Sequence, residues 1–224
     1  MVGMFYVGVS FVLGVQGATD ITPGASSRAS FTETSTQTLD AQAGNVTQVD
    51  ISGQAITAHW AGFFGNISGN ITLKDSSGNS FYDWAGLGTP GGEVFASTDN
   101  AVSWSGIGCA SGAELSAIDI ALGIDSSDAD GINETYTLNS FPGFEVAGVA
   151  ISGCNSTNAY SGGGLEATAY YQILLTDTEG DAVYTTIIND SATSFTGSGA
   201  DFELLVGEND GAGTTAIYFY IELD

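Results

Sequence analysis

An acidic stretch in the middle of the chain carries the residue types that bind hard cations. Residues 125–134 read DSSDADGINE. Three of them match the third, fifth and sixth positions of an EF-hand-like calcium loop: Asp128, Asp130 and Gly131. The first and last positions of that loop do not match, because Ser126 and Thr137 stand there. Weak calcium binding, with Asp125 as an out-of-phase ligand, is one interpretation, and a solvated acidic turn is the one that we favour.

The residue types that enzymes use for catalysis form no recognisable motif in this sequence. His59 is the only histidine, and residues 65–69, GNISG, miss the serine position of a nucleophile elbow. One histidine and two well-separated cysteines cannot supply a common zinc ligand set. The sequence places no pair of its 26 acidic residues across a cleft, as a glycosidase requires. We therefore expect no enzymatic activity, and no cofactor unless calcium binds.

The charge balance excludes two classes of partner. The 224 residues carry a formal net charge of −24, with Arg28 and Lys74 as the only basic side chains. Such a polyanion cannot neutralise phosphates, so we expect no nucleic-acid binding and no basic patch for anionic lipid. The chain is nevertheless 43% hydrophobic, which is too apolar for a disordered acidic tail. A saline habitat, where salt screens the carboxylates, is compatible with this composition, and so is an ordinary acidic surface.

The N-terminus indicates export. Residues 4–15, MFYVGVSFVLGV, form an uncharged apolar run. Gln16 and the small residues Gly17 and Ala18 follow it. This pattern predicts a signal peptide over residues 1–18, although no basic residue precedes the run. The alternative is a retained hydrophobic segment that serves as an anchor or as a filament-core helix.

If the chain is exported, its cysteines and several asparagines are candidates for covalent modification. Cys109 and Cys154 are the only cysteines, and an even pair in an exported chain favours a disulfide over two buried thiols. Six asparagines precede x-Ser/Thr and are predicted to carry N-linked glycans: Asn45, Asn66, Asn70, Asn133, Asn155 and Asn189. Strand alternation over residues 66–73 places two of these acceptors on a wet face, with apolar residues facing inward.

Short β-prone runs broken by Gly, Asn, Asp and Ser dominate the chain. Residues 217–223 alternate strictly, with one apolar face and one amphipathic, partly exposed face. Residues 170–175 and 183–188 flank a turn-rich segment and predict a hairpin. One helix is predicted over residues 113–122, with Ser111 as its cap and Gly123 as its stop.

These signals predict a mainly β, β-sandwich-like fold, jelly-roll or immunoglobulin-like, with one short helix and an N-terminal arm. We assign residues 1–18 to the leader, 19–40 to the arm and 41–224 to a β-rich domain. The arm is polar and weakly alternating, and a lone β-prone segment needs a sheet edge to pair with. Four of its residues represent the predicted assembly segment: Ser26, Phe31, Thr34 and Leu39.

Four rigid aromatic residues could form a sugar-stacking platform or fill the core between sheets: Trp60, Tyr82, Trp84 and Trp104. We favour the core for the tryptophans.

Several short segments of the sequence resemble those of a group of secreted archaeal surface proteins of uncharacterised role. They are GNVT at residues 44–47, WAGFFGNISG at 60–69, ITL at 71–73 and YDW at 82–84, with the tail from Asp201 to Leu223. The likeness covers most of the mature chain. It implies an archaeal envelope or appendage protein at the cell surface and brings no catalytic residues.

Together these features predict a structural subunit of an extracellular archaeal filament or surface coat. Such a subunit would associate with itself by β-strand addition, and would touch a membrane only through residues 1–18 if they are retained. The alternative is a monomeric surface module that binds carbohydrate or another ligand. A third possibility, a secreted hydrolase, requires two close carboxylates of split pKa in a cleft.

Overall fold

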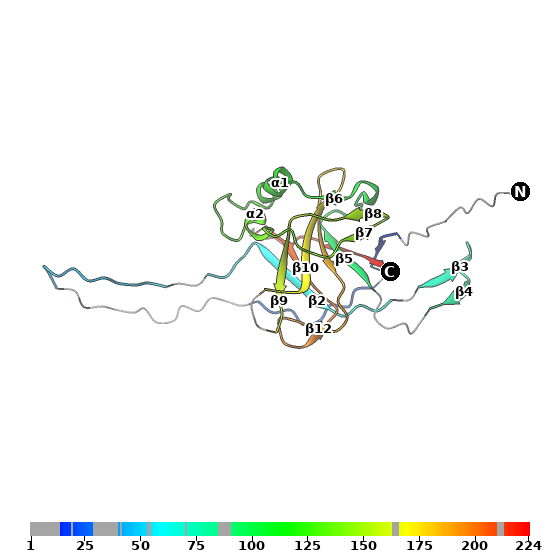
Figure 1. Cartoon of the computed structure of the whole chain (residues 1–224), viewed down its shortest axis with the longest axis horizontal. Helices are drawn as coiled ribbons and strands as arrows, with labels where there is room; N and C mark the ends of the chain where they lie inside the picture. Colours follow the sequence, from blue (N-terminus) through cyan, green and yellow to red (C-terminus); the bar gives the residue numbers. More distant parts are fainter. Residues whose placement is uncertain are drawn as a thin grey trace, which may run out of the picture.

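A computed structural model describes residues 14–18, 20–28, 40, 42–52, 55–69, 71–84, 91–162, 166–209 and 213–224. Its centre is an antiparallel sheet of four main strands (Figure 1): β5 (Gly92–Ser97), β10 (Glu166–Thr176), β11 (Ala182–Ile187) and β15 (Tyr218–Leu223). The strand order is β1–β15–β5–β11–β10, and β10 also pairs with β6 and β9. These shorter strands are β1 (Gln16–Gly17), β6 (Gly108–Cys109) and β9 (Ser156–Tyr160). The predicted hairpin is confirmed as β10–β11, and the predicted last strand as β15.

Alternating residues of this sheet face two separate hydrophobic cores. On β5, Val94 and Ala96 belong to the first core and Phe95 belongs to the second. On β10, Leu174 faces the first core while Ile173 faces the second. A sheet covered on both faces explains why these strands contain near-continuous apolar runs.

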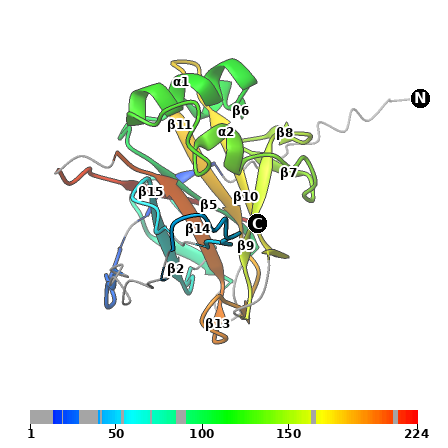
Figure 2. The same ribbon diagram turned by 90° about the vertical axis from the view of Figure 1, so that its left-hand side faces the viewer.

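Different elements cover the two faces (Figure 2). The first core is closed by a ribbon of β2 (Trp60–Gly65) and β14 (Phe202–Gly207), together with the helices. The second core is closed by the hairpin of β7 (Phe144–Val146) and β8 (Val149–Ile151), together with the 3₁₀ turn η1 (Trp104–Gly106). A central sheet with a smaller β-layer against it confirms the mainly β, sandwich-like prediction.

A buried glutamine joins the two β-layers. Gln172 of β10 is fully buried, and its Nε2 donates to the carbonyl oxygen of Glu203 at 2.8 Å. Its Oε1 accepts from the backbone N–H of Leu205 at 2.9 Å. The side-chain amide thus pairs with the edge of β14 as a neighbouring strand would, and it satisfies backbone groups that would otherwise be unpaired.

The predicted helix is confirmed as α1 (Gly112–Leu122). Ser111 and Glu114 form a reciprocal capping box, and Gly123 ends the helix in the left-handed conformation with φ of 74°. A second helical turn, α2 (Ile132–Thr135), was not predicted, because four residues are too few for a periodic signal. Neither helix is long and apolar enough to cross a membrane, and the same holds for the rest of the described chain.

The predicted disulfide is confirmed. Cys109 of β6 is bonded to Cys154, with their Cα atoms 4.9 Å apart. It joins the strand next to β10 to the residues just before β9, and so ties together one end of the central sheet.

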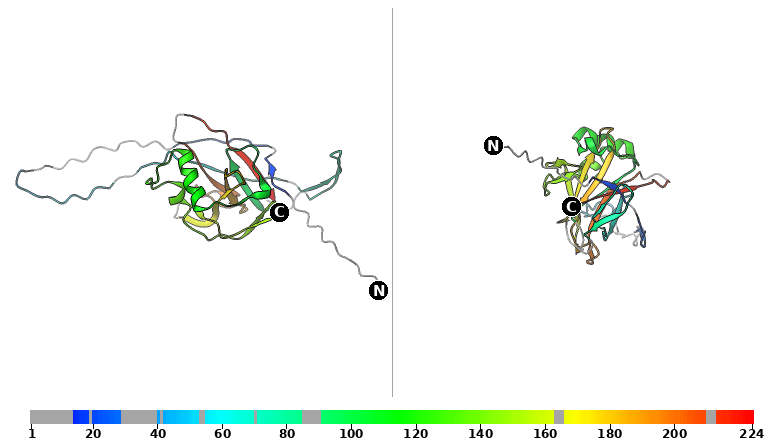
Figure 3. Two further views of the ribbon diagram at one scale, coloured as in Figure 1. Left: turned by 90° about the horizontal axis from the view of Figure 1, so that it is seen from above. Right: turned by 90° about the vertical axis from the view of Figure 1, so that its right-hand side faces the viewer.

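Two parts of the chain project from the sheets at opposite ends of the molecule (Figures 1 and 3). One is the chain that precedes β2, where no described residue between 20 and 59 belongs to a helix or strand. The other is the hairpin of β3 (Thr72–Lys74) and β4 (Ser80–Asp83). The only basic side chains, Arg28 and Lys74, are exposed on these two projections. A further small hairpin joins β12 (Ala192–Thr193) to β13 (Gly199–Ala200).

The structure corrects three predictions. Residues 66–73 are not one strand: β2 ends at Gly65 and β3 begins at Thr72, and Leu73 is exposed rather than inward-facing. Glu222, on the face of β15 predicted to be partly exposed, is buried, because the turn between β7 and β8 covers it. The stretch without regular structure continues past residue 40, where the sequence predicted the β-rich domain to begin.

The predicted leader and arm lie largely outside the described residues. Of residues 1–18, the structure describes 14–18, and Gln16 and Gly17 within them form β1 on the outer edge of β15. In the predicted assembly segment, Ser26 is exposed, while Phe31, Thr34 and Leu39 lie outside the described residues.

Candidate functional site

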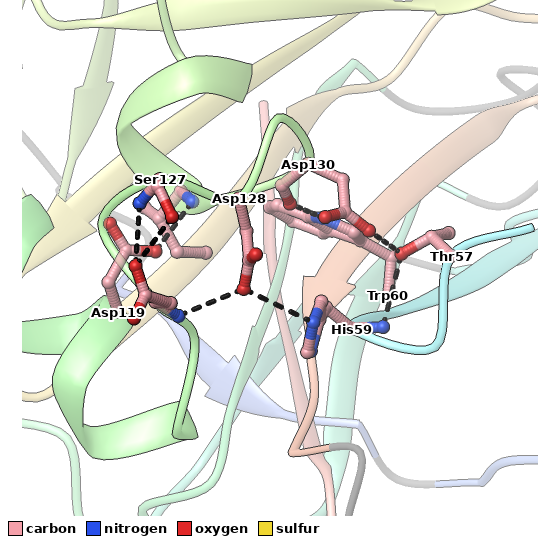
Figure 4. A network of polar contacts seen from close by, with 9 residues as sticks. Thr57, His59, Trp60, Asp119, Ser127, Asp128 and Asp130 are labelled. Atoms are coloured by element: carbon pink, nitrogen blue, oxygen red, sulfur yellow. Dashed lines mark hydrogen bonds and ion pairs between the residues drawn. The ribbon is translucent and has the colours of Figure 1, made fainter. Parts of the chain in front are cut away.

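The chain entering β2 meets the predicted calcium loop in a cluster of polar contacts (Figure 4). The Thr57 hydroxyl donates to the Asp130 carboxylate, and the Trp60 indole N–H donates to the Asp130 carbonyl oxygen at 2.6 Å. His59 Nε2 lies 3.9 Å from Asp128 Oδ2. We call these five residues the arm-base cluster. It fixes the point at which the projecting arm, residues 20–57, joins the body.

The three predicted calcium ligands turn to different partners. Asp125 accepts hydrogen bonds from the backbone and the hydroxyl of Ser127 at 2.9 and 2.7 Å, and these bonds lower the pKa of its carboxyl. Asp128 accepts the backbone N–H of Asp125 at 3.0 Å, while Asp130 faces the arm. The structure therefore gives this loop a role in holding the arm, and calcium binding stays a prediction.

A buried carboxylate on α1 holds the acidic loop, residues 125–134, in position. Asp119 of α1 is buried, and it accepts the backbone N–H groups of Ile132 and Asn133 at 2.7 and 3.4 Å. It thereby caps the start of α2 from another helix, because the Ncap residue, Gly131, has no side chain to do so. The acidic loop is held between its two helices through this contact.

One other carboxylate group could suit a metal ion among the described residues. The carboxylate oxygens of Asp99, Asp177 and Asp181 lie within 4.8 Å of one another at the turn between β10 and β11. Burial opposes ionisation of Asp177, but backbone N–H donors, including those of Ser103 and Glu179, outweigh it and lower its pKa. Burial, then Asp177 and Asp99, raises the pKa of Asp181. The carboxylate oxygens of Asp177 thus already accept hydrogen bonds that stabilise the turn, and a metal ion would compete with these bonds.

Two glutamates lie directly opposite each other inside the sheet. Glu93 of β5 pairs in register with Glu222 of β15, and they are 2% and 4% exposed. Burial, followed by the charges of Asp224 and Glu222, raises the pKa of Glu93 to about 8. Burial also raises the pKa of Glu222, against the backbone N–H of Ala147, which lowers it. A pair buried to this extent is closed to a polysaccharide, so it gives no support to the hydrolase hypothesis.

The structure separates the four aromatic residues into two groups. Trp104 packs in the second core with its ring centroid 5.1 Å from those of Phe95 and Tyr220, and Trp60 packs on the first core. Tyr82 and Trp84, on and just after β4, are exposed, with ring centroids 4.9 Å apart. The predicted core position of the tryptophans is confirmed for Trp60 and Trp104 and wrong for Trp84. A platform of all four residues is also wrong, and an exposed pair, Tyr82 and Trp84, remains.

The predicted glycan acceptors also differ in their surroundings. Asn45 and Asn66 are exposed, and Asn155 is half-buried. The amide nitrogens of Asn133 and Asn189 donate hydrogen bonds to Ser116 and Ala169 at 2.9 and 2.8 Å, which a glycan on those atoms would disturb. Asn70 lies outside the described residues.

No known protein family model matches the chain, and no curated protein or solved structure is similar to it.

Proposed function

We propose that this chain is a non-enzymatic structural subunit of an extracellular filament or surface coat, whose copies are joined by added β-strands. The observation that carries the proposal is the arm, whose described residues are exposed and form no helix or strand. Five of its exposed side chains are β-branched and apolar: Ile21, Val46, Val49, Ile51 and Ile56. Burying such a side chain is worth about 1.5–3 kcal/mol, so a partner that covers the arm gains stability.

Other features support the same function. The apolar N-terminus and the exposed acceptors Asn45 and Asn66 fit an exported glycoprotein. The resemblance to secreted archaeal surface proteins fits an envelope or appendage. Residues 26–39 remain the assembly segment predicted from sequence, and residues 42–57 add a described stretch of the same arm.

Negative-stain microscopy and sedimentation of the native protein test the proposal. We expect polymers, and more of them at about 1 M than at about 0.1 M NaCl, because salt screens repulsion between copies that each carry −24 charges. Single copies at both salt concentrations would contradict the proposal.

A monomeric carbohydrate-binding module is the second candidate, favoured by the exposed pair Tyr82 and Trp84. It predicts that Trp84→Ala weakens binding to an oligosaccharide array at least tenfold. Phe195→Ala, which removes an exposed aromatic ring elsewhere, serves as the control.

A further inference from the structure

A strand-like segment in the arm pairs with no described strand of its own chain. Residues 46–52 are all exposed; Thr47, Val49 and Ile51 alternate with Val46, Gln48 and Asp50. The amide of Gln48 donates to the carboxylate of Asp50 at 3.4 Å, as expected for side chains on one face of an extended segment. Two of the β-branched residues lie nearly or wholly in solvent, since Ile51 is 90% exposed and Val46 fully so.

An open sheet edge is present in the same molecule. The backbone N–H of Glu208 donates to the carbonyl of His59, which sets the phase of the β2–β14 ladder. In an antiparallel ladder alternate residues turn their N–H and C=O groups outward, so those of Gly62 and Phe64 face away from β14. No strand of the described chain pairs with β2 on that side, and both residues are exposed.

The edges of the other strands of five or more residues are at least partly occupied. β15 is paired with β1, and the far edge of β14 is held by Gln172. β9 makes a bridge through Ser156 to Leu138, and its residues are mostly buried. Among the strands of five or more residues, β2 therefore offers the most accessible edge to an added strand, and the open edges of the hairpins β3–β4, β7–β8 and β12–β13 are shorter.

We propose that residues 46–52 of one copy add as an edge strand to β2 of a second copy. This inference rests on the proposed function and identifies the two surfaces that join. The arm-base cluster argues for a second copy, because it holds Thr57 and Trp60 so that the arm leaves the body rather than folding back along β2 (Figures 1 and 4).

Charge and glycan placement suit this contact. Asp50 is the only charged residue in residues 46–52, and β2 has none, although the chain carries −24 charges. The exposed acceptors Asn45 and Asn66 flank the two segments rather than lie within them. Donor and acceptor are different surfaces, so the contact is head-to-tail. Such a contact adds copies one after another and gives a fibre when the rotation between copies does not close a ring.

Two single variants and their mixture test the inference by sedimentation and microscopy. Ile51→Asp places a charge in the donor strand, and Gly62→Pro removes an outward N–H from the acceptor edge, a position where proline is tolerated. Each variant is expected to lower polymer mass at least tenfold with an unchanged thermal midpoint. Mixed in equal amounts they should form dimers, because one intact donor and one intact acceptor remain.

Ile120→Asp is the matched control. Ile120 lies on α1, outside both surfaces, and is 78% exposed, so its replacement should leave polymer mass unchanged. Should Gly62→Pro fail to fold, copies with Val49→Cys and copies with Phe64→Cys should form a mixed disulfide. Copies with Ile120→Cys in place of Phe64→Cys should form none.

The outcomes separate this inference from the proposed function. If the native protein and Ile51→Asp polymerise equally, residues 46–52 are not the donor, while the structural function stands and residues 26–39 become the next segment to test. If the native protein never polymerises, the proposed function fails and this inference fails with it.

Discussion

The arm and the central sheet use the same kinds of side chain in opposite surroundings. Ile51 of the arm lies in solvent, whereas Ile173 of β10 is fully buried between β-layers. Val46 and Val183 form the same contrast. The difference shows that the body buries its apolar strand residues on both faces of the sheet, while the described arm leaves residues of the same types exposed, and the proposed function covers them with a second copy.

The sharpest test of this comparison is one substitution made in both regions. Ile173→Ala should lower the free energy of unfolding by about 4 kcal/mol, because it leaves a cavity in the second core. Ile51→Ala should change the stability of the single copy by less than about 0.5 kcal/mol, because Ile51 is 90% exposed. Urea unfolding of dilute protein measures both, and equal effects would show that the arm packs on its own body.

A smaller effect is expected where the sheets are joined. Gln172→Leu should cost about 3 kcal/mol, because the backbone groups of Glu203 and Leu205 lose their partner. Thr186→Val is the matched control: it removes a buried hydroxyl that makes no hydrogen bond and should be nearly neutral. The same urea assay compares the two, and a neutral Gln172→Leu would mean that β14 does not need this bridge.

The smallest expected effect is a pH dependence confined to the body. The pKa of Glu93 is about 8 in the folded protein and lies near its ordinary 4.5 in the unfolded chain. The folded protein therefore keeps a proton that the unfolded chain loses between these values, and stability falls as the pH rises through this window. We expect the thermal midpoint to fall by about 4 °C between pH 7 and pH 9 from this cause, since the linkage removes about 1.4 kcal/mol over that range.

Glu93→Gln isolates this contribution from the general repulsion of a polyanion. The variant should lose less stability than the native protein over the same pH range, as measured by calorimetry. If the thermal midpoints of the two proteins fall equally with pH, other carboxylates cause the pH dependence.

Local signals in the sequence predicted the local structure well. Ser111, Glu114 and Gly123 act within a few residues of α1, and the turn between β10 and β11 lies between two β-prone runs. Residues 66–73 show the limit of such signals. Their alternation is observed from Asn66 to Ser68, but whether a strand continues depends on the length of β14, its distant partner.

The features that define the candidate site depend on residues far apart in the chain. Asp130 meets Thr57 and Trp60 across 73 and 70 residues, and Gln172 reaches Glu203 across 31. Glu93 and Glu222 become neighbours only when the first and last main strands of the sheet pair. Periodicity and motif spacing carry no information about such contacts. A polar residue inside an otherwise apolar strand, as at Gln172 and Glu93, was the available signal.

The placement of Arg28 and Lys74 has a practical consequence for how the protein is cut by proteases. Trypsin-like proteases cut after basic residues, and both such sites are exposed and lie outside the central sheet, with Arg28 before β2 and Lys74 at the end of β3. Digestion would give residues 1–28, 29–74 and 75–224, so β2 would be held to β14 only by non-covalent contacts, while the disulfide would stay within the last piece.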